Sequence, residues 1–135
     1  MRRGSLPWGT RIVAGAFTLS GVVHLVRPSV FEPLIPNVLG NPTPWVLGSG
    51  VAELICAAGL ISRRRWAPVA STATLAVIWV GNWQMAIDVT SANESAAATA
   101  AVWARLPLQI PLMLWAWRSP VRARDDMDSA EPGRV

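Results

Sequence analysis

Four long apolar segments alternate with short polar segments along the chain. They cover about residues 8–26, 45–61, 66–87 and 96–117, and each contains few charged side chains. At a rise of about 1.5 Å per residue, roughly 20 helical residues cross the hydrocarbon core of a bilayer. The pattern therefore predicts an all-α integral membrane protein, a four-helix bundle in which every apolar segment is a transmembrane helix.

The first apolar segment also has features of a signal peptide. Arginines precede it, and its apolar run over residues 12–25 has the length of a signal-peptide core. No small-x-small cleavage site follows this run, so we expect a helix that the mature protein retains. One face of this helix is expected to point into the bundle, because its members recur at helical spacing: Phe17, Ser20, Gly21 and His24.

A proline-rich segment, residues 27–44, separates the first two predicted helices. Its five prolines exclude a long helix, since each removes a backbone donor and clashes with the preceding turn. The segment is nevertheless too rich in valine, leucine, isoleucine and phenylalanine for an ordinary solvated loop. We predict a short interfacial or re-entrant segment over one end of the bundle, with a plain loop as the alternative.

The arginines predict the topology. Ten of the twelve fall before the first helix or at its start, in the turn at residues 63–65, or in the tail at residues 118–135, all on one side of a four-helix bundle. Because positive loops stay in the cytoplasm, both termini are predicted to be cytoplasmic in a multi-pass protein of the bacterial inner membrane. This distribution explains the net charge of +4 without nucleic acid. The domain covers residues 1–117, and the charged tail, residues 118–135, is predicted to be disordered.

Each predicted helix carries a polar side chain in the half of the bundle away from these arginines. Counted at 1.5 Å per residue from the outer helix ends, His24 lies about 3 Å deep, Asn82 about 8 Å, Glu53 about 12 Å and Arg105 about 14 Å. Charged groups inside a membrane face the bundle interior and pair with one another. We therefore predict that Glu53 and Arg105 form a buried ion pair, supported by Asn82.

The fourth predicted helix contains two prolines, Pro107 and Pro111, which leave backbone carbonyls without their usual donors. Such carbonyls need other donors inside a membrane. Arg105 and Gln109 lie one turn apart on the same face of this helix, and we expect them to supply these donors.

Three interpretations of this polar centre are open. It is a buried ion pair that fixes the helix register, a polar pocket that holds a lipid headgroup or a quinone ring, or a proton relay through His24 and Glu53. With one histidine and one cysteine, the chain alone provides neither a CxxC pair nor a metal site. No catalytic residue set and no glycine-rich phosphate loop is evident, so we expect no independent enzymatic activity and no cofactor other than a quinone.

Several short motifs occur in a characteristic order. They are SGVVH at residues 20–24, then Pro28, Phe31 and Ile35-Pro36, GVAEL at residues 50–54, Asn82, and RLPLQ at residues 105–109. In this order they resemble the DoxX-like family of small four-helix bacterial membrane proteins, over about residues 11–117. The family takes its name from a small subunit associated with a terminal quinol oxidase and a thiosulfate:quinone oxidoreductase.

The resemblance implies a four-helix fold, an inner-membrane location and a link to quinone redox chemistry. The family's polar positions are matched here by Glu53, Arg105, Gln109, Asn82 and His24. The thiol pairs of some relatives have no counterpart in this chain.

The expected function is that of a non-catalytic accessory or assembly subunit of a membrane redox system. Its expected partners are the lipid bilayer and either a redox protein or a second copy of the chain. The alternative is a quinone-linked oxidoreductase subunit that binds a quinone or a lipid headgroup at the centre formed by Glu53 and Arg105.

Overall fold

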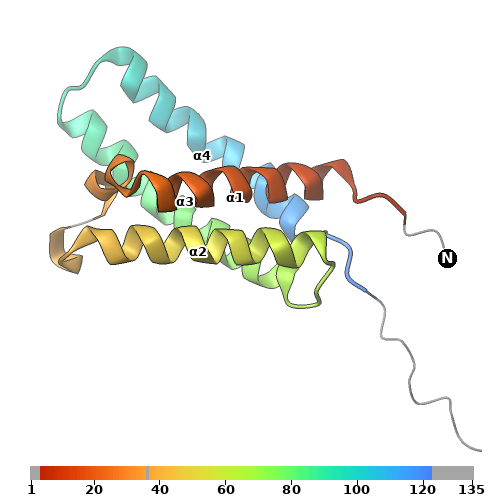
Figure 1. The fold of residues 1–135 in the computed structure, drawn as a ribbon. Coiled ribbons are helices and arrows are strands. Elements are labelled where there is room, and N and C mark those ends of the chain that lie inside the picture. The colour runs from red at the N-terminus through yellow and green to blue at the C-terminus, as the bar shows by residue number, and fades with distance from the viewer. Residues whose placement is uncertain (1–3, 36, 123–135) are drawn as a thin grey trace, which may run out of the picture.

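The computed structural model describes residues 4–35 and 37–122, and every regular element in this part of the chain is helical. The four α-helices are α1 (Trp8–Val26), α2 (Pro42–Ile61), α3 (Ala67–Ser91) and α4 (Ala96–Trp117) (Figure 1). Three of them, α1, α2 and α4, are long and apolar enough to cross a membrane. The all-α prediction is therefore confirmed, together with three candidate spans.

Helices α1 and α4 have the predicted bounds, whereas α2 begins three residues before the predicted start. Its first turn is stabilised by Asn41, whose side-chain oxygen accepts a hydrogen bond from the backbone N–H of Thr43 at 3.2 Å. Pro42 occupies the first helical position, where its missing N–H is not needed. The prolines at the end of the connecting segment thus help to start the helix.

Helix α3 extends to Ser91, four residues beyond the predicted end at residue 87. The polar residues of this last turn form hydrogen bonds one turn back along the helix. Gln84 Nε2 donates to Asp88 Oδ1 at 2.9 Å, and Thr90 Oγ1 donates to the carbonyl of Ala86 at 2.7 Å. These local bonds retain in the helix a polar stretch that hydropathy alone assigns to a loop.

The proline-rich connection is not one interfacial helix. It forms three one-turn 3₁₀ helices, η1 (Pro28–Val30), η2 (Glu32–Leu34) and η3 (Asn37–Leu39). Its prolines favour short i→i+3 turns, in which the N–H of Phe31 donates to the carbonyl of Pro28 at 2.9 Å. Because η1 contacts both α1 and α2, the segment covers one end of this helix pair, while its interfacial or re-entrant position in a membrane stays a prediction.

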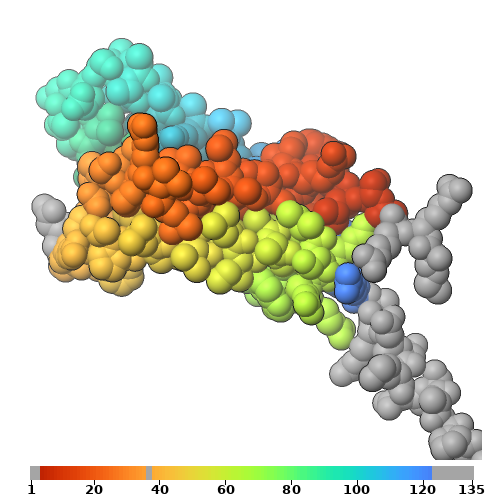
Figure 2. Space-filling view, viewed as in Figure 1, coloured from red at the N-terminus to blue at the C-terminus, as the bar shows by residue number. Residues whose placement is uncertain are grey.

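The helices form two antiparallel hairpins, α1 with α2 and α3 with α4 (Figure 1). The four helices share a core at the end of the molecule that carries both termini, and α1 there also contacts α4. At the opposite end the α3–α4 hairpin diverges from α1 and α2 and forms a separate lobe (Figure 2). The shared core includes Val13, Phe17, Cys56, Leu60, Leu75 and Ala116, and the lobe has its own cluster of Ala86, Val102 and Leu106.

The end with the shared core is closed by polar contacts. The hydroxyls of Thr10 and Ser119 lie 3.0 Å apart and are buried, and the N–H of Arg122 donates to the carbonyl of Arg63 at 2.9 Å. Residues 118–122 belong to the tail that is predicted to be disordered, and these bonds attach Ser119 and Arg122 to α1 and to the α2–α3 turn. The rest of that predicted tail, residues 123–135, lies outside the described residues.

Candidate functional site

Glu53 lies three residues after a close contact between α1 and α2 at Gly50, and only 2% of its surface is exposed. Two glycines make this approach possible. A Cβ atom added at Gly21 would lie 2.8 Å from the carbonyl oxygen of Gly50, and one added at Gly50 would lie 2.7 Å from the Cβ of His24. The two backbones therefore lie close together at these glycines, and the carboxylate of Glu53 faces His24 of α1.

The imidazole of His24 lies beside the carboxylate of Glu53. Its Nδ1 lies 3.7 Å from Glu53 Oε2 and 2.8 Å from the carbonyl oxygen of Ser20. Because a carbonyl oxygen can only accept a hydrogen bond, the contact with Ser20 requires a proton on Nδ1. The imidazole also stacks on Phe31, with ring centroids 3.7 Å apart and planes 12° apart. The imidazole ring is thus fixed by α1 and by the segment that follows it.

One oxygen of the Glu53 carboxylate is left without a hydrogen bond. Within the described residues Oε2 has no hydrogen-bond partner, because 3.7 Å exceeds the usual length of such a bond. A buried polar atom without a partner costs free energy, and the cost is larger for a charged group. The imidazole of His24 is the neighbour across this gap, 3.7 Å away. The predicted proton relay stays a prediction.

Arg105 lies elsewhere. It is exposed on α4, and its Nη1 atom contacts the sulfur of Met85 at 3.8 Å. Among the described residues, Glu53 and Arg105 do not form the predicted ion pair. The reason is the helix pairing: α4 packs along α3, while α2 and α4 have little or no direct contact. Glu53 and Arg105 are predicted to lie at a similar depth along their helices, but the helices that carry them pack on different neighbours.

Asn82 and Gln109 form a second polar group, between α3 and α4. Gln109 is buried, and its Nε2 donates to the carbonyl of Leu75 at 3.0 Å. Asn82 Nδ2 donates to Gln109 Oε1 at 3.5 Å. We expected Gln109 to donate to carbonyls freed by the prolines of its own helix, but it instead joins α4 to α3. Hydrogen bonds of this kind stabilise helix pairs in membranes.

The five predicted site residues therefore occupy three places. His24 and Glu53 lie between α1 and α2, Asn82 and Gln109 lie between α3 and α4, and Arg105 lies on the outside of α4. Sequence reasoning did not identify Trp79, whose indole N–H donates to the carbonyl of Leu106 at 3.2 Å. The available signal was an indole donor in an apolar helix, because a buried tryptophan usually finds an acceptor.

The comparisons with known proteins identify a family. A family model described as "Domain of unknown function (DUF8561)" matches residues 13–120, which include all four helices from the first turns of α1 onward. No curated protein and no solved structure matches the chain.

Proposed function

We propose that the chain, which belongs to the DUF8561 family, is an integral membrane protein with four spanning helices and both termini in the cytoplasm. Three helices meet the length and composition of membrane spans. Helix α3 is more polar, but it connects the inner end of α2 to the outer end of α4 and is about 37 Å long at 25 residues. A segment that joins those two ends crosses the same thickness as its neighbours.

Reporter fusions test whether α3 crosses the membrane. A reporter inserted at Arg64 is expected to be cytoplasmic, and one inserted at Asn93 is expected to lie outside, because α3 separates the two positions. The measurement is the activity of paired reporters that work on opposite sides of the membrane. A cytoplasmic reporter at Asn93 would contradict the four-span topology.

We further propose that the protein is a non-catalytic accessory or assembly subunit of a membrane redox system. The observation that carries this proposal is the exposure of Arg105 on α4. It lies nine residues, about 14 Å, from the outer end of that helix at Ala96. Among the residues that the structure describes, its side chain contacts the thioether of Met85, which is a weak acceptor.

A guanidinium at this depth needs an anion or several strong acceptors. An exposed position favours a source outside this chain, and a carboxylate on a helix of another membrane subunit meets the need directly. The DoxX-like resemblance indicates the kind of partner, a component of a quinol-oxidising system. Together these points support an accessory subunit that docks through the outer half of α4.

Site-specific photo-cross-linking in native membranes tests this proposal. A photoreactive residue at Leu108, one turn beyond Arg105 and 64% exposed, is expected to cross-link to one redox subunit. The matched control is Leu19 on α1, which is 70% exposed and is expected to give no such product. Arg105→Gln is expected to abolish the product at Leu108. Equal products from both positions, or cross-links from Leu108 to lipid alone, would contradict the docking role.

The unbonded oxygen of Glu53 favours one alternative, a quinone-linked oxidoreductase subunit. A quinol hydroxyl is a donor of the kind that Oε2 lacks, and His24 lies beside it. Arg105 is not part of this version of the site. Quinone retained by protein purified in a mild detergent, and lost in Glu53→Gln, would favour this alternative, whereas purified protein without quinone would exclude it.

A further inference from the structure

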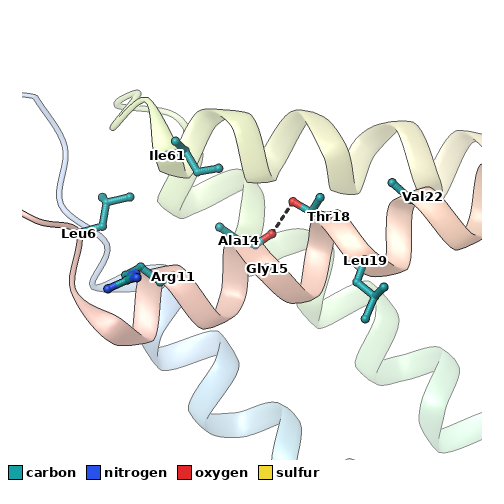
Figure 3. Close-up of a pocket in the computed structure, with 8 residues that line it drawn as sticks. All are labelled: Leu6, Arg11, Ala14, Gly15, Thr18, Leu19, Val22 and Ile61. Atoms are coloured by element: carbon teal, nitrogen blue, oxygen red, sulfur yellow. Dashed lines mark hydrogen bonds between the residues drawn. The ribbon is translucent and has the colours of Figure 1, made fainter.

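A groove with a volume of about 600 Å³ runs along the outside of α1 (Figure 3). Arg11 and Leu6 lie at one end and Val22 at the other, while Ile61 of α2 forms part of its wall. The lining is otherwise apolar, apart from Thr18, whose hydroxyl donates to the carbonyl of Ala14 at 2.8 Å. The groove therefore offers hydrocarbon contacts along its length and one cation at its end.

The dimensions of the groove match one leaflet of a bilayer. Arg11 and Val22 are eleven residues apart, which is about 16 Å along a helix and about half of a 30 Å hydrocarbon core. Its volume is within the roughly 300–1,000 Å³ typical of ligand pockets. An apolar groove at this depth is filled by hydrocarbon and not by water.

Other arginines lie at the end of the molecule at which Arg11 closes the groove. The α2–α3 turn with Arg63, Arg64 and Arg65 lies at the same end of the molecule as the start of α1 and the end of α4 (Figure 1). The guanidinium of Arg63 is held by the carbonyl of Gly4, whereas Arg11 is exposed and forms no ion pair with the described residues. Arginines near a membrane surface attract anionic headgroups.

We propose that this groove binds one acyl chain of an anionic phospholipid, with the lipid phosphate on the guanidinium of Arg11. A phosphate accepts hydrogen bonds from a guanidinium in a planar, bidentate geometry, and the acyl chain extends from it along Leu19 and Val22. The inference rests on the membrane insertion in the proposed function, but not on the proposed partner.

Two substitutions test the two parts of the site, each with a matched control. Gly15→Leu introduces a side chain into the groove at a position where a Cβ atom would meet no heavy atom within 4 Å. Gly48→Leu is its control, since Gly48 is equally open but lies on α2 outside the groove. Arg11→Gln removes the guanidinium that is proposed to bind the phosphate. Its control is Arg64→Gln, which removes an exposed arginine at the same end of the molecule.

The measurement is lipid binding to the full-length, detergent-purified protein by native mass spectrometry, with phosphatidylglycerol and phosphatidylcholine of identical acyl chains. The original protein is expected to prefer phosphatidylglycerol about fivefold, the effect of one arginine near a headgroup. Arg11→Gln is expected to remove this preference, and Gly15→Leu is expected to reduce the binding of both lipids. The two control variants are expected to bind as the original protein does.

Two results would overturn the proposal. An equal loss of preference in Arg11→Gln and Arg64→Gln would show a diffuse charge effect without a site. Unchanged binding in Gly15→Leu would show that the groove is not occupied. Either failure leaves the topology test and the expected cross-link at Leu108 unaffected, because neither depends on this groove.

Discussion

Replacing Gly21 by valine is expected to destabilise the protein by about 3 kcal/mol, near the upper end of the usual cost of overpacking. A Cβ atom at this position would lie 2.8 Å from the backbone oxygen of Gly50 and equally close to Leu54. The Leu54 side chain can rotate away from the new methyl groups. The backbone oxygen of Gly50 can move away only if α1 and α2 separate. The measurement is thermal unfolding of the detergent-solubilised protein.

The matched control is Gly15→Val on the same helix. A Cβ atom at Gly15 would meet nothing within 4 Å, so the same chemical change is expected to have an effect close to zero. Equal losses at both positions would show that the cost of valine itself, and not the helix contact, determines the result. Such a result would contradict the close approach of α1 and α2 at Gly21.

The second large effect is expected at His24. Replacing His24 by leucine removes the polar side chain beside the buried Glu53 carboxyl, and leaving a buried polar group unsatisfied costs about 1–3 kcal/mol. Adding Glu53→Gln to this variant is expected to recover about 1 kcal/mol, because the remaining amide carries no charge. This recovery is modest because polar contacts between membrane helices are weaker than their burial suggests. A double-mutant cycle on thermal stability, which includes Glu53→Gln alone, measures the coupling between the two residues.

Arg105 supplies the control for this cycle. Arg105→Gln and Glu53→Gln are expected to have additive effects on stability, because Arg105 is exposed on α4 and contacts Met85. Coupling between Glu53 and Arg105 as large as that with His24 would contradict the structure. It would instead support the ion pair that the sequence predicts.

Hydropathy predicted the helices best where polar residues bound an apolar run on both sides. The bounds of α1 and α4 follow this pattern. It failed at the end of α3, where Asp88 and Thr90 are helical because their side chains bond within the helix. It failed again in the connection after α1, because proline density excludes a long helix but does not specify how many short turns replace it.

The burial of Glu53 could be predicted from the sequence, but the residue that lies beside its carboxylate could not. A carboxylate in an apolar helix had to find a partner, and Glu53 does lie buried beside one. Depth along the helix axes favoured Arg105, whereas the actual partner depends on which helices pair and how each is rotated. Gly21 and Gly50 determine both, since α1 and α2 can approach closely only along the face that carries these residues.

The unequal packing at the two ends of the bundle has a mechanical consequence. The hairpins are joined at the end where Thr10 meets Ser119 and Trp115 covers Gly9. Any rigid-body rotation of one hairpin against the other must therefore have its pivot there, and displacement increases with distance from this pivot. The largest displacement would fall at the 3₁₀ segment and the α3–α4 turn, which lie at the end of the molecule away from this pivot (Figure 1).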